Sequence, residues 1–147
     1  EIVSNFYRAL PNEIKMASDE EKFLYIFKWC CSTIKYDISA CNSDGTLKYD
    51  RKDSQDPINT FEKRSGVCEG RARLIKALLN NCYIKIPCFL VKGKAGRLQH
   101  TWNETIIDND IIDFDISNQA NREDNNHQEL DMYNTFINVT KKNKKRI

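Results

Sequence analysis

Apolar residues recur at three- and four-residue steps after Ser18, a pattern that predicts an amphipathic helix. Ser18-Asp19-Glu20-Glu21 has the form of a capping box, in which the side chains of Ser18 and Glu21 satisfy each other's unpaired backbone N–H groups. The apolar stripe that follows, through about Lys35, consists of Phe23, Ile26, Phe27, Cys30 and Ile34. We expect this helix to bury its stripe, with Cys30 as a core residue.

The middle of the chain is polar and interrupts the helical pattern. From Asp37 to Ser65, the turn signal Asn42-Ser43-Asp44-Gly45 and the breaker Asp56-Pro57 predict an irregular connection with a short helix near Asn59 to Lys63. A second helix is expected from about Val67 to Asn80. Its inward-facing residues are Leu74, Ile75, Leu78 and Leu79.

Strand-like segments occupy the rest of the chain. Tyr83 to Lys92 is rich in Ile, Phe, Leu and Val, while Leu98 to Ile107 and Ile111 to Ile116 flank the turn Asp108-Asn109-Asp110 and predict a hairpin. Asn118 to Glu129 is expected to be a polar loop, and Met132 to Val139 a further strand. Helices followed by paired strands predict an α+β domain, in which a helix packs against an antiparallel sheet.

Length, composition and charge indicate one globular unit. The chain has 147 residues, of which 40% are hydrophobic and 30% charged, and its net charge is +2. No apolar run approaches the roughly 20 residues of a membrane span, and the only basic run, residues 141–146, is interpreted as a solvated tail. We predict a single domain over residues 1–147, excised from a longer chain, with no nucleic-acid partner and no membrane insertion.

The six cysteines do not match a metal site or a full set of disulfides. Cys30 and Cys31 are adjacent, and no spacing resembles a paired CxxC zinc site. If Cys68 stays a free thiol, five cysteines remain, which cannot all pair within one chain. This odd number weakly favours a reducing environment.

Cys68 stands between two glycines at the expected start of the second helix. Unpaired backbone N–H groups and the helix dipole favour a thiolate there, but the dipole supplies only about 0.3 to 2 kcal/mol, so a partner is needed. Gly66 and Gly70 remove side chains where a substrate backbone would approach. The backbone N–H of Cys68 and one further donor would then stabilise an oxyanion.

One of the two histidines is suited to be that partner. His127 lies in a loop sequence and is interpreted as an exposed bystander, whereas strand alternation places His100 and Trp102 on one face. A hairpin turning at 108–109 brings His100 beside Asp115, whose carboxylate would accept the imidazole N–H while Trp102 shields the contact from water. Asp113 points the same way by alternation and remains an alternative to Asp115.

Each of these features has a plainer interpretation when it is taken alone. A buried cysteine is more often inert packing than a nucleophile, and a strand histidine is usually a satisfied core group. Their combination favours a nucleophilic Cys68, with His100 as base and then acid and Asp115 orienting the ring.

Three segments carry a resemblance to a known family: GVCEGRARLIKALLNNCYIKIPC, HTWN and IIDFDIS. They resemble the transglutaminase-like superfamily of papain-like fold, in which a GVCxG helix start, an HxWN strand and a terminal aspartate form a Cys-His-Asp triad. Cys68, His100 and Asp115 match this triad in order and spacing. The chain is most similar to bacterial transglutaminase-like domains and to the kyphoscoliosis peptidase type. Arg71 replaces the tyrosine of their VCEGYA motif, and Thr101 replaces the alanine of HAWN.

The resemblance implies a transglutaminase-core fold, with N-terminal helices and the nucleophile helix packed on an antiparallel sheet. It implies a thiol-dependent acyl-transfer enzyme acting on protein or peptide amides through an acyl-enzyme, with hydrolysis, and hence a cysteine protease, as the default. A protein-glutamine transglutaminase or deamidase is the enzymatic alternative, and a non-catalytic interaction module on the same fold is the alternative of another class.

Gln55, thirteen residues ahead of Cys68, resembles the side-chain oxyanion donor of papain-like enzymes, with Asn59 as a competitor. Animal transglutaminases add calcium sites, but this sequence has no EF-hand pattern. We therefore expect no metal and no cofactor.

Overall fold

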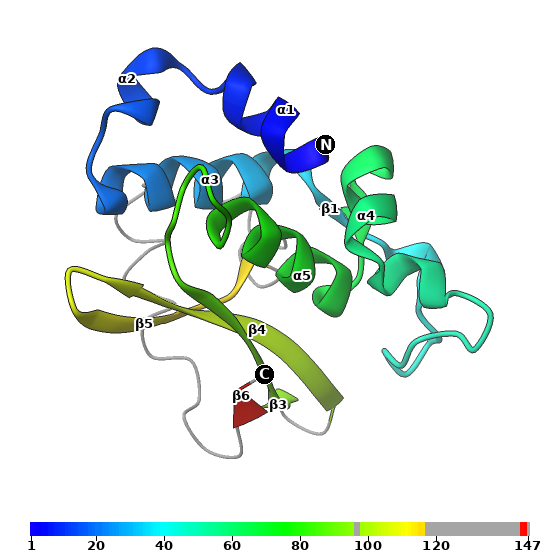
Figure 1. The fold of residues 1–147 in the computed structure, drawn as a ribbon. Coiled ribbons are helices and arrows are strands. Elements are labelled where there is room, and N and C mark those ends of the chain that lie inside the picture. The colour runs from blue at the N-terminus through cyan, green and yellow to red at the C-terminus, as the bar shows by residue number, and fades with distance from the viewer. Residues whose placement is uncertain (96–97, 117–144, 147) are drawn as a thin grey trace.

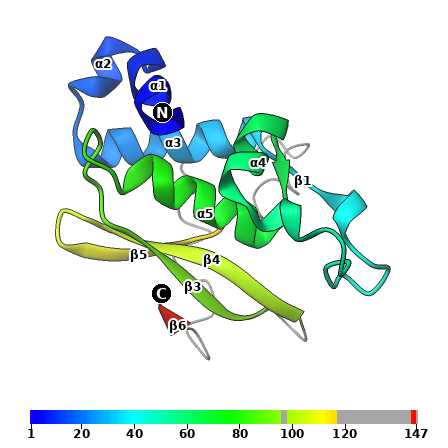
Figure 2. The same cartoon turned by 45° about the vertical axis from the view of Figure 1, so that its right-hand side comes forward.

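The computed structural model describes residues 1–95, 98–116 and 145–146. Helices form one layer and an antiparallel sheet forms the other, with helix α5 (Cys68–Leu79) lying between helix α3 (Asp19–Thr33) and the sheet (Figures 1 and 2). This is the predicted α+β architecture.

Helix α3 follows the sequence pattern closely. The backbone N–H of Glu21 donates to Ser18 Oγ at 3.2 Å, which confirms Ser18 as the N-cap. All five residues of the expected stripe are buried. Cys30 is a core residue as predicted, and burial raises the pKa of its thiol well above the ordinary value.

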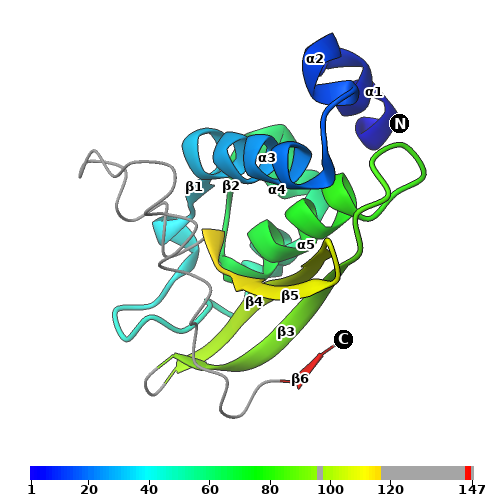
Figure 3. The same cartoon turned by 90° about the vertical axis from the view of Figure 1, so that its left-hand side faces the viewer.

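Two short helices that sequence reasoning does not predict precede α3. Helices α1 (Ile2–Ala9) and α2 (Asn12–Lys15) flank Pro11 and lie on the side of α3 away from the sheet (Figure 3). Phe6 and Leu10 are buried and anchor this segment to the core. Ile2, Phe6 and Leu10 follow one another at four-residue steps, a helical pattern to which sequence reasoning assigns no element.

The polar middle of the chain is more ordered than its sequence suggests. It contains strand β1 (Lys35–Tyr36), two 3₁₀ turns, η1 (Ile38–Ala40) and η2 (Lys52–Gln55), helix α4 (Pro57–Lys63) and strand β2 (Ser65–Gly66). The short helix predicted near Asn59 begins earlier, because the Asp56 side chain accepts from the Ile58 N–H and Pro57 occupies the first turn. Strands β1 and β2 pair in parallel just before α5.

The sheet contains strands β3 (Cys88–Ala95), β4 (Leu98–Ile107), β5 (Asp110–Phe114) and β6 (Lys145–Arg146), in the order β5-β4-β3-β6, with antiparallel neighbours. The bounds of β4 are those predicted, and the β4–β5 hairpin is confirmed, with Asp108 and Asn109 at positive φ in its turn. The expected strand at 111–116 begins one residue earlier and ends at Phe114. The predicted loop at 118–129 and strand at 132–139 lie outside the described residues.

One strand prediction is half wrong. The pattern from Tyr83 to Lys92 predicts an extended segment throughout, but β3 begins only at Cys88. The Asn81 side chain accepts hydrogen bonds from the N–H groups of Tyr83 and Ile84 at 2.9 Å, and Lys85 has a φ of 61°. These local bonds form a turn, although its residues have high strand propensity.

The core fills the space between the helices and one face of the sheet. Its central side chains include Phe23, Ile26, Leu78, Ile86 and Phe114. In the part of the chain described above, no helix combines the length and apolar character required to cross a bilayer.

Candidate active site

The thiol of Cys68 is held at the first residue of α5 by a network that fixes the preceding backbone. The Val67 N–H lies 3.1 Å from both the carbonyl and the hydroxyl oxygen of Ser54, a buried residue of η2. The Ser54 hydroxyl donates to Asp37 Oδ2 at 2.9 Å, and Arg51 binds the same oxygen at 2.9 Å. Burial alone would raise the pKa of Asp37, but hydrogen bonds from Ser39, Ser54 and Arg51 lower it.

His100 and Asp115 meet where β4 and the end of β5 run side by side. The register pairs Asn103 with Phe114, so Asp115 directly follows the last paired residue. His100 Nε2 lies 2.5 Å from Asp115 Oδ2, and the two side chains are 14% and 1% exposed. The contact predicted from the hairpin is present with Asp115; Asp113, the alternative, is buried on β5.

Cys68 interacts with the same imidazole. Burial by itself would lower the pKa of His100, but hydrogen bonds to Asp115 and to Cys68, together with the negative charge of both groups, raise it to about 10. Since Nε2 is engaged by Asp115, the nitrogen that remains for Cys68 is Nδ1. The three residues that the sequence singles out are therefore neighbours in space.

Two further residues of the HTWN segment hold this geometry. The Trp102 ring stacks on the imidazole of His100, with centroids 5.9 Å apart, and is almost fully buried, as expected of a shield against water. Asn103 Nδ2 donates to the Ala72 carbonyl of α5 at 3.0 Å and to the Phe89 carbonyl of β3 at 3.3 Å. Asn103 thus ties the strand that carries His100 to the helix that carries Cys68, a role that sequence reasoning does not assign.

Comparison with protein families identifies the fold. A family model described as a transglutaminase-like domain matches residues 5–120. The chain belongs to this family. The match covers helix α5 with Cys68, the β4–β5 hairpin and Asp115.

Two solved structures are similar to this transglutaminase-like domain. A structure described only as a TGase is 17% identical, with a TM-score of 0.64 over 78% of this chain and 30% of that chain, and supports the fold. A provisionally assigned cysteine protease from Cytophaga hutchinsonii is 27% identical, with a TM-score of 0.49 over 65% of this chain and 30% of that chain. In both comparisons, the matched region makes up only 30% of the other protein's chain. None of the curated proteins compared with it matches.

The glycines around Cys68 serve close packing within the transglutaminase-like domain. A Cβ added at Gly66 would lie 2.4 Å from Thr60 Oγ1 of α4. One added at Gly70 would lie 2.3 Å from the Ser54 carbonyl oxygen and 2.5 Å from Thr60 Oγ1. The protein itself fills the space beside both glycines, and a role for Gly66 in positioning substrate stays a prediction.

Tyr36 is a neighbour of Cys68 to which sequence reasoning assigns no role. It lies in β1, opposite Gly66 in β2. Burial raises the pKa of the Tyr36 hydroxyl, which also interacts with the backbone N–H of Cys68 and the thiol of Cys41. The available signal is the segment Ile34-Lys35-Tyr36-Asp37, whose pairing with β2 is a long-range contact that local pattern does not predict.

The two candidates for a side-chain oxyanion donor differ in their surroundings. Gln55 is half-buried at the end of η2, which packs against α5, and its side chain makes no hydrogen bond to the described residues. Asn59 Nδ2 instead donates to the Asp53 carbonyl at 3.0 Å. The Asn59 amide is thus engaged in a local hydrogen bond, and the role of Gln55 as an oxyanion donor stays a prediction.

The departures from the family motif are both buried. Thr101 is 5% exposed on β4, and Arg71 is fully buried on α5. Arg71 Nη2 donates to the Ile34 carbonyl at 2.7 Å, and its guanidinium carbon lies 6.0 Å from the centre of the Tyr36 ring. A buried arginine with these partners belongs to the internal structure of the site.

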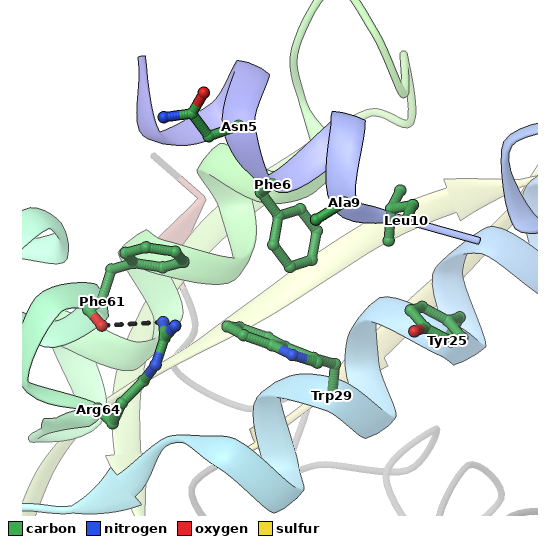
Figure 4. A pocket seen from close by; sticks show the side chains of 8 residues that line it. All are labelled: Asn5, Phe6, Ala9, Leu10, Tyr25, Trp29, Phe61 and Arg64. Carbon is green, nitrogen blue, oxygen red and sulfur yellow. Dashed lines mark hydrogen bonds between the residues drawn. The ribbon is translucent and has the colours of Figure 1, made fainter. Parts of the chain in front are cut away.

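A separate pocket of about 280 Å³ opens between α1, α3 and α4 (Figure 4). Its lining is largely apolar, and Arg64 extends across the rings of Trp29 and Phe61. The lining residues are Asn5, Phe6, Ala9, Leu10, Tyr25, Trp29, Phe61 and Arg64. The pocket contains none of Cys68, His100 and Asp115.

Among residues 1–95, 98–116 and 145–146, no group of three His, Cys, Asp or Glu side chains is arranged to hold a metal ion.

Proposed function

We propose that this transglutaminase-like domain is a thiol-dependent acyl-transfer enzyme for protein or peptide amides, and that it works as a cysteine protease or hydrolase. The observation that supports this most strongly is the environment of one imidazole. Asp115 binds its Nε2 at 2.5 Å, and Cys68 interacts with the same ring. Nucleophilic catalysis requires a nucleophile in contact with a base and a third group that orients the base. Cys68, His100 and Asp115 would fill these three roles in that order.

Before the first half of the reaction, the proton of the Cys68 thiol has already moved to His100 Nδ1. The sulfur attacks the carbonyl carbon of the amide, and the carbonyl π electrons move onto oxygen, where the backbone N–H of Cys68 stabilises the charge. Collapse of this intermediate breaks the carbon–nitrogen bond, and the imidazolium gives its proton to the departing amine. The acyl group remains on Cys68 as a thioester.

In the second half, a nucleophile resolves the thioester with His100 again as base. Water gives hydrolysis, and a primary amine gives transamidation, with the same proton transfers in both cases. The raised pKa of His100 favours the imidazolium at neutral pH, so a thiolate–imidazolium pair is the resting form in this proposal. Asp115 accepts a hydrogen bond from Nε2–H throughout, without taking the proton, and fixes the ring orientation.

One incubation tests the reaction class. The domain is mixed with a glutamine-rich protein digest, with and without a primary amine, and mass spectrometry follows the products. Hydrolysis appears as new peptide termini, deamidation as conversion of glutamine to glutamate, and transamidation as incorporation of the amine. We expect new termini, and products of the other two kinds would move the assignment to a deamidase or transglutaminase.

The matched control for this incubation is Cys68→Ala. The variant should give no product of any kind while remaining folded in urea titrations, because the thiol supplies the nucleophile. Full activity of the variant would remove Cys68 from the mechanism. Wild-type protein without any product, together with an unreactive Cys68, would instead favour a non-catalytic interaction module.

A further inference from the structure

Tyr36 is placed beside the nucleophile by main-chain pairing. The β1–β2 register sets Tyr36 opposite Gly66, and the Asp37 N–H donates to the Gly66 carbonyl at 3.0 Å. Gly66 precedes Cys68 by two residues, so the half-buried Tyr36 side chain lies at the start of α5. There its hydroxyl interacts with the backbone N–H of Cys68, the group that the proposed mechanism uses to stabilise the oxyanion.

Arg71 holds the ring that carries this hydroxyl. Its guanidinium carbon lies 6.0 Å from the centre of the Tyr36 ring, within the range of a cation–π interaction. The guanidinium is fully buried and fixed to the Ile34 carbonyl by a 2.7 Å hydrogen bond. A buried cation is costly unless neighbouring groups compensate its charge, and the Tyr36 ring is one of these groups. Moving the ring away would remove that compensation, so Arg71 favours the observed position of Tyr36.

We propose that Tyr36 is the second oxyanion donor of the acyl-transfer site and that Arg71 is the residue that positions it. The inference rests on the proposed function, since an oxyanion forms only if Cys68 attacks a carbonyl. In the free protein, the Tyr36 hydroxyl interacts with the Cys68 N–H. A bound carbonyl oxygen takes over that N–H, and the Tyr36 O–H then donates to the same oxygen as the carbonyl π electrons move onto it.

The ionisation state of Tyr36 suits this role. Burial and the nearby thiols of Cys68 and Cys41 raise the pKa of the phenol above its ordinary value, and the Cys68 N–H only partly opposes them. The hydroxyl therefore keeps its proton at neutral pH, and it remains a donor.

Two reagents that react with the same sulfur separate an oxyanion role from a structural one. Acylation of Cys68 by p-nitrophenyl acetate passes through a tetrahedral oxyanion, whereas alkylation by iodoacetamide is a direct displacement and does not. For Tyr36→Phe, which keeps the ring, we expect acylation to slow by about 10²-fold, the usual cost of losing one oxyanion donor. Alkylation should be unchanged. Unchanged acylation, or an equal loss in both reactions, would overturn the inference.

Two controls separate failure of the inference from failure of the proposed function. If wild-type Cys68 is not acylated at all, or if Cys68→Ala forms acyl-protein equally fast, the proposed function itself fails. If wild-type acylation depends on Cys68 and Gln55→Ala, instead of Tyr36→Phe, selectively slows it, the donor is Gln55 and only the present inference fails.

The positioning role of Arg71 is tested by a double-mutant cycle. Arg71→Met should slow acylation several-fold without slowing alkylation, and should cause no further loss in a Tyr36→Phe background, since Arg71 acts through the hydroxyl. Equal losses in both backgrounds would contradict this role. Should Arg71→Met fail to fold, Arg71→Tyr, which restores the residue of the VCEGYA motif, is expected to give the same non-additive result.

Discussion

At the level of single residues, the site depends on how one imidazole is surrounded. His100 is mostly buried, which alone would disfavour its protonated form, yet the Asp115 carboxylate and the Cys68 sulfur more than offset this cost. The result is a ring whose Nε2 side is fixed by Asp115 and whose Nδ1 side is left for Cys68. The stacked Trp102 excludes water from this contact and strengthens its electrostatics.

Replacing Asp115 by asparagine tests the orientation of the ring. The amide would offer an N–H to Nε2 and favour the wrong tautomer of His100, so we expect Cys68 acylation by p-nitrophenyl acetate to fall by roughly three to four orders of magnitude. Asp113→Asn is the matched control, because Asp113 is also a buried carboxylate of the same hairpin. Urea unfolding should show both variants folded. A loss that followed Asp113 and spared Asp115 would reassign the third member of the triad.

At the level of helices and turns, the site is assembled where α4, η2 and α5 pack closely. Gly70 of α5 faces the Ser54 carbonyl and the Thr60 hydroxyl with no room for a side chain. The same Ser54 carbonyl accepts from the Val67 N–H, so this packing also fixes the backbone that leads into Cys68.

The substitution Gly70→Ala distinguishes tight packing from helix propensity by its sign. In an exposed helix, the change would raise the free energy of unfolding by about 0.8 to 1 kcal/mol. Here the added Cβ would lie 2.3 Å from a backbone oxygen, so we expect the free energy to fall by about 1 to 3 kcal/mol instead. Urea denaturation measures it, with Gly70→Ala combined with Thr60→Ala as a partial rescue, since this second change removes the Oγ1 atom that would lie 2.5 Å from the added Cβ. A stabilised single variant would show that the three elements do not pack as described.

The elements that the sequence predicts best are those with local signals. Helix α3 has a cap and a regular stripe, and the hairpin has polar turn residues at positive φ. The sequence therefore predicts that His100 lies near Asp113 or Asp115, and the structure shows the contact with Asp115. The turn around Asn81 does not follow from local propensity, since hydrogen bonds to the Asn81 side chain outweigh the strand propensity of the residues that follow it. Helix α1 does carry a helical pattern of apolar residues, which sequence reasoning leaves unassigned.

The parts of the site that the sequence does not predict all depend on contacts between segments distant in the chain. Tyr36 reaches Cys68 through the β1–β2 pair, and Asn103 joins β4 to α5. Neither contact leaves a periodic trace, because each is a single polar or aromatic group satisfied by a partner more than 25 residues away. The HTWN and IKYD segments mark these residues, but only the fold assigns them roles.

At the level of the folded domain, the site makes stability depend on pH. The pKa of His100 rises from an ordinary 6.5 to about 10 on folding, so the folded state holds the proton more tightly than the unfolded state. The resulting stabilisation is complete below pH 6.5 and is lost as the pH rises towards 10. The interactions of His100 with Asp115 and Cys68 thus stabilise the fold in acid and neutral solution.

This dependence is measurable as a difference between two proteins. The free energy of unfolding of the wild type minus that of His100→Gln should be largest below pH 6.5 and should shrink between there and pH 10. Urea titrations at several pH values give this difference. The ionisation of groups that do not interact with His100 contributes equally to both proteins and cancels. A difference that grew with rising pH would mean that His100 is held neutral in the folded protein.

The reactivity of Cys68 relative to an ordinary thiol of the same chain decides whether sulfur and imidazole share a proton. Cys82 is exposed and outside the site, so it serves as an internal reference. Iodoacetamide is added across a range of pH, and peptide mass spectrometry gives the alkylation rate of each cysteine. At about pH 6, where an ordinary thiol is almost entirely protonated, we expect Cys68 to react much faster than Cys82 and to lose this advantage in His100→Gln. Equal rates for the two cysteines, with the same steep rise with pH, would contradict a thiolate–imidazolium pair and with it the proposed enzyme.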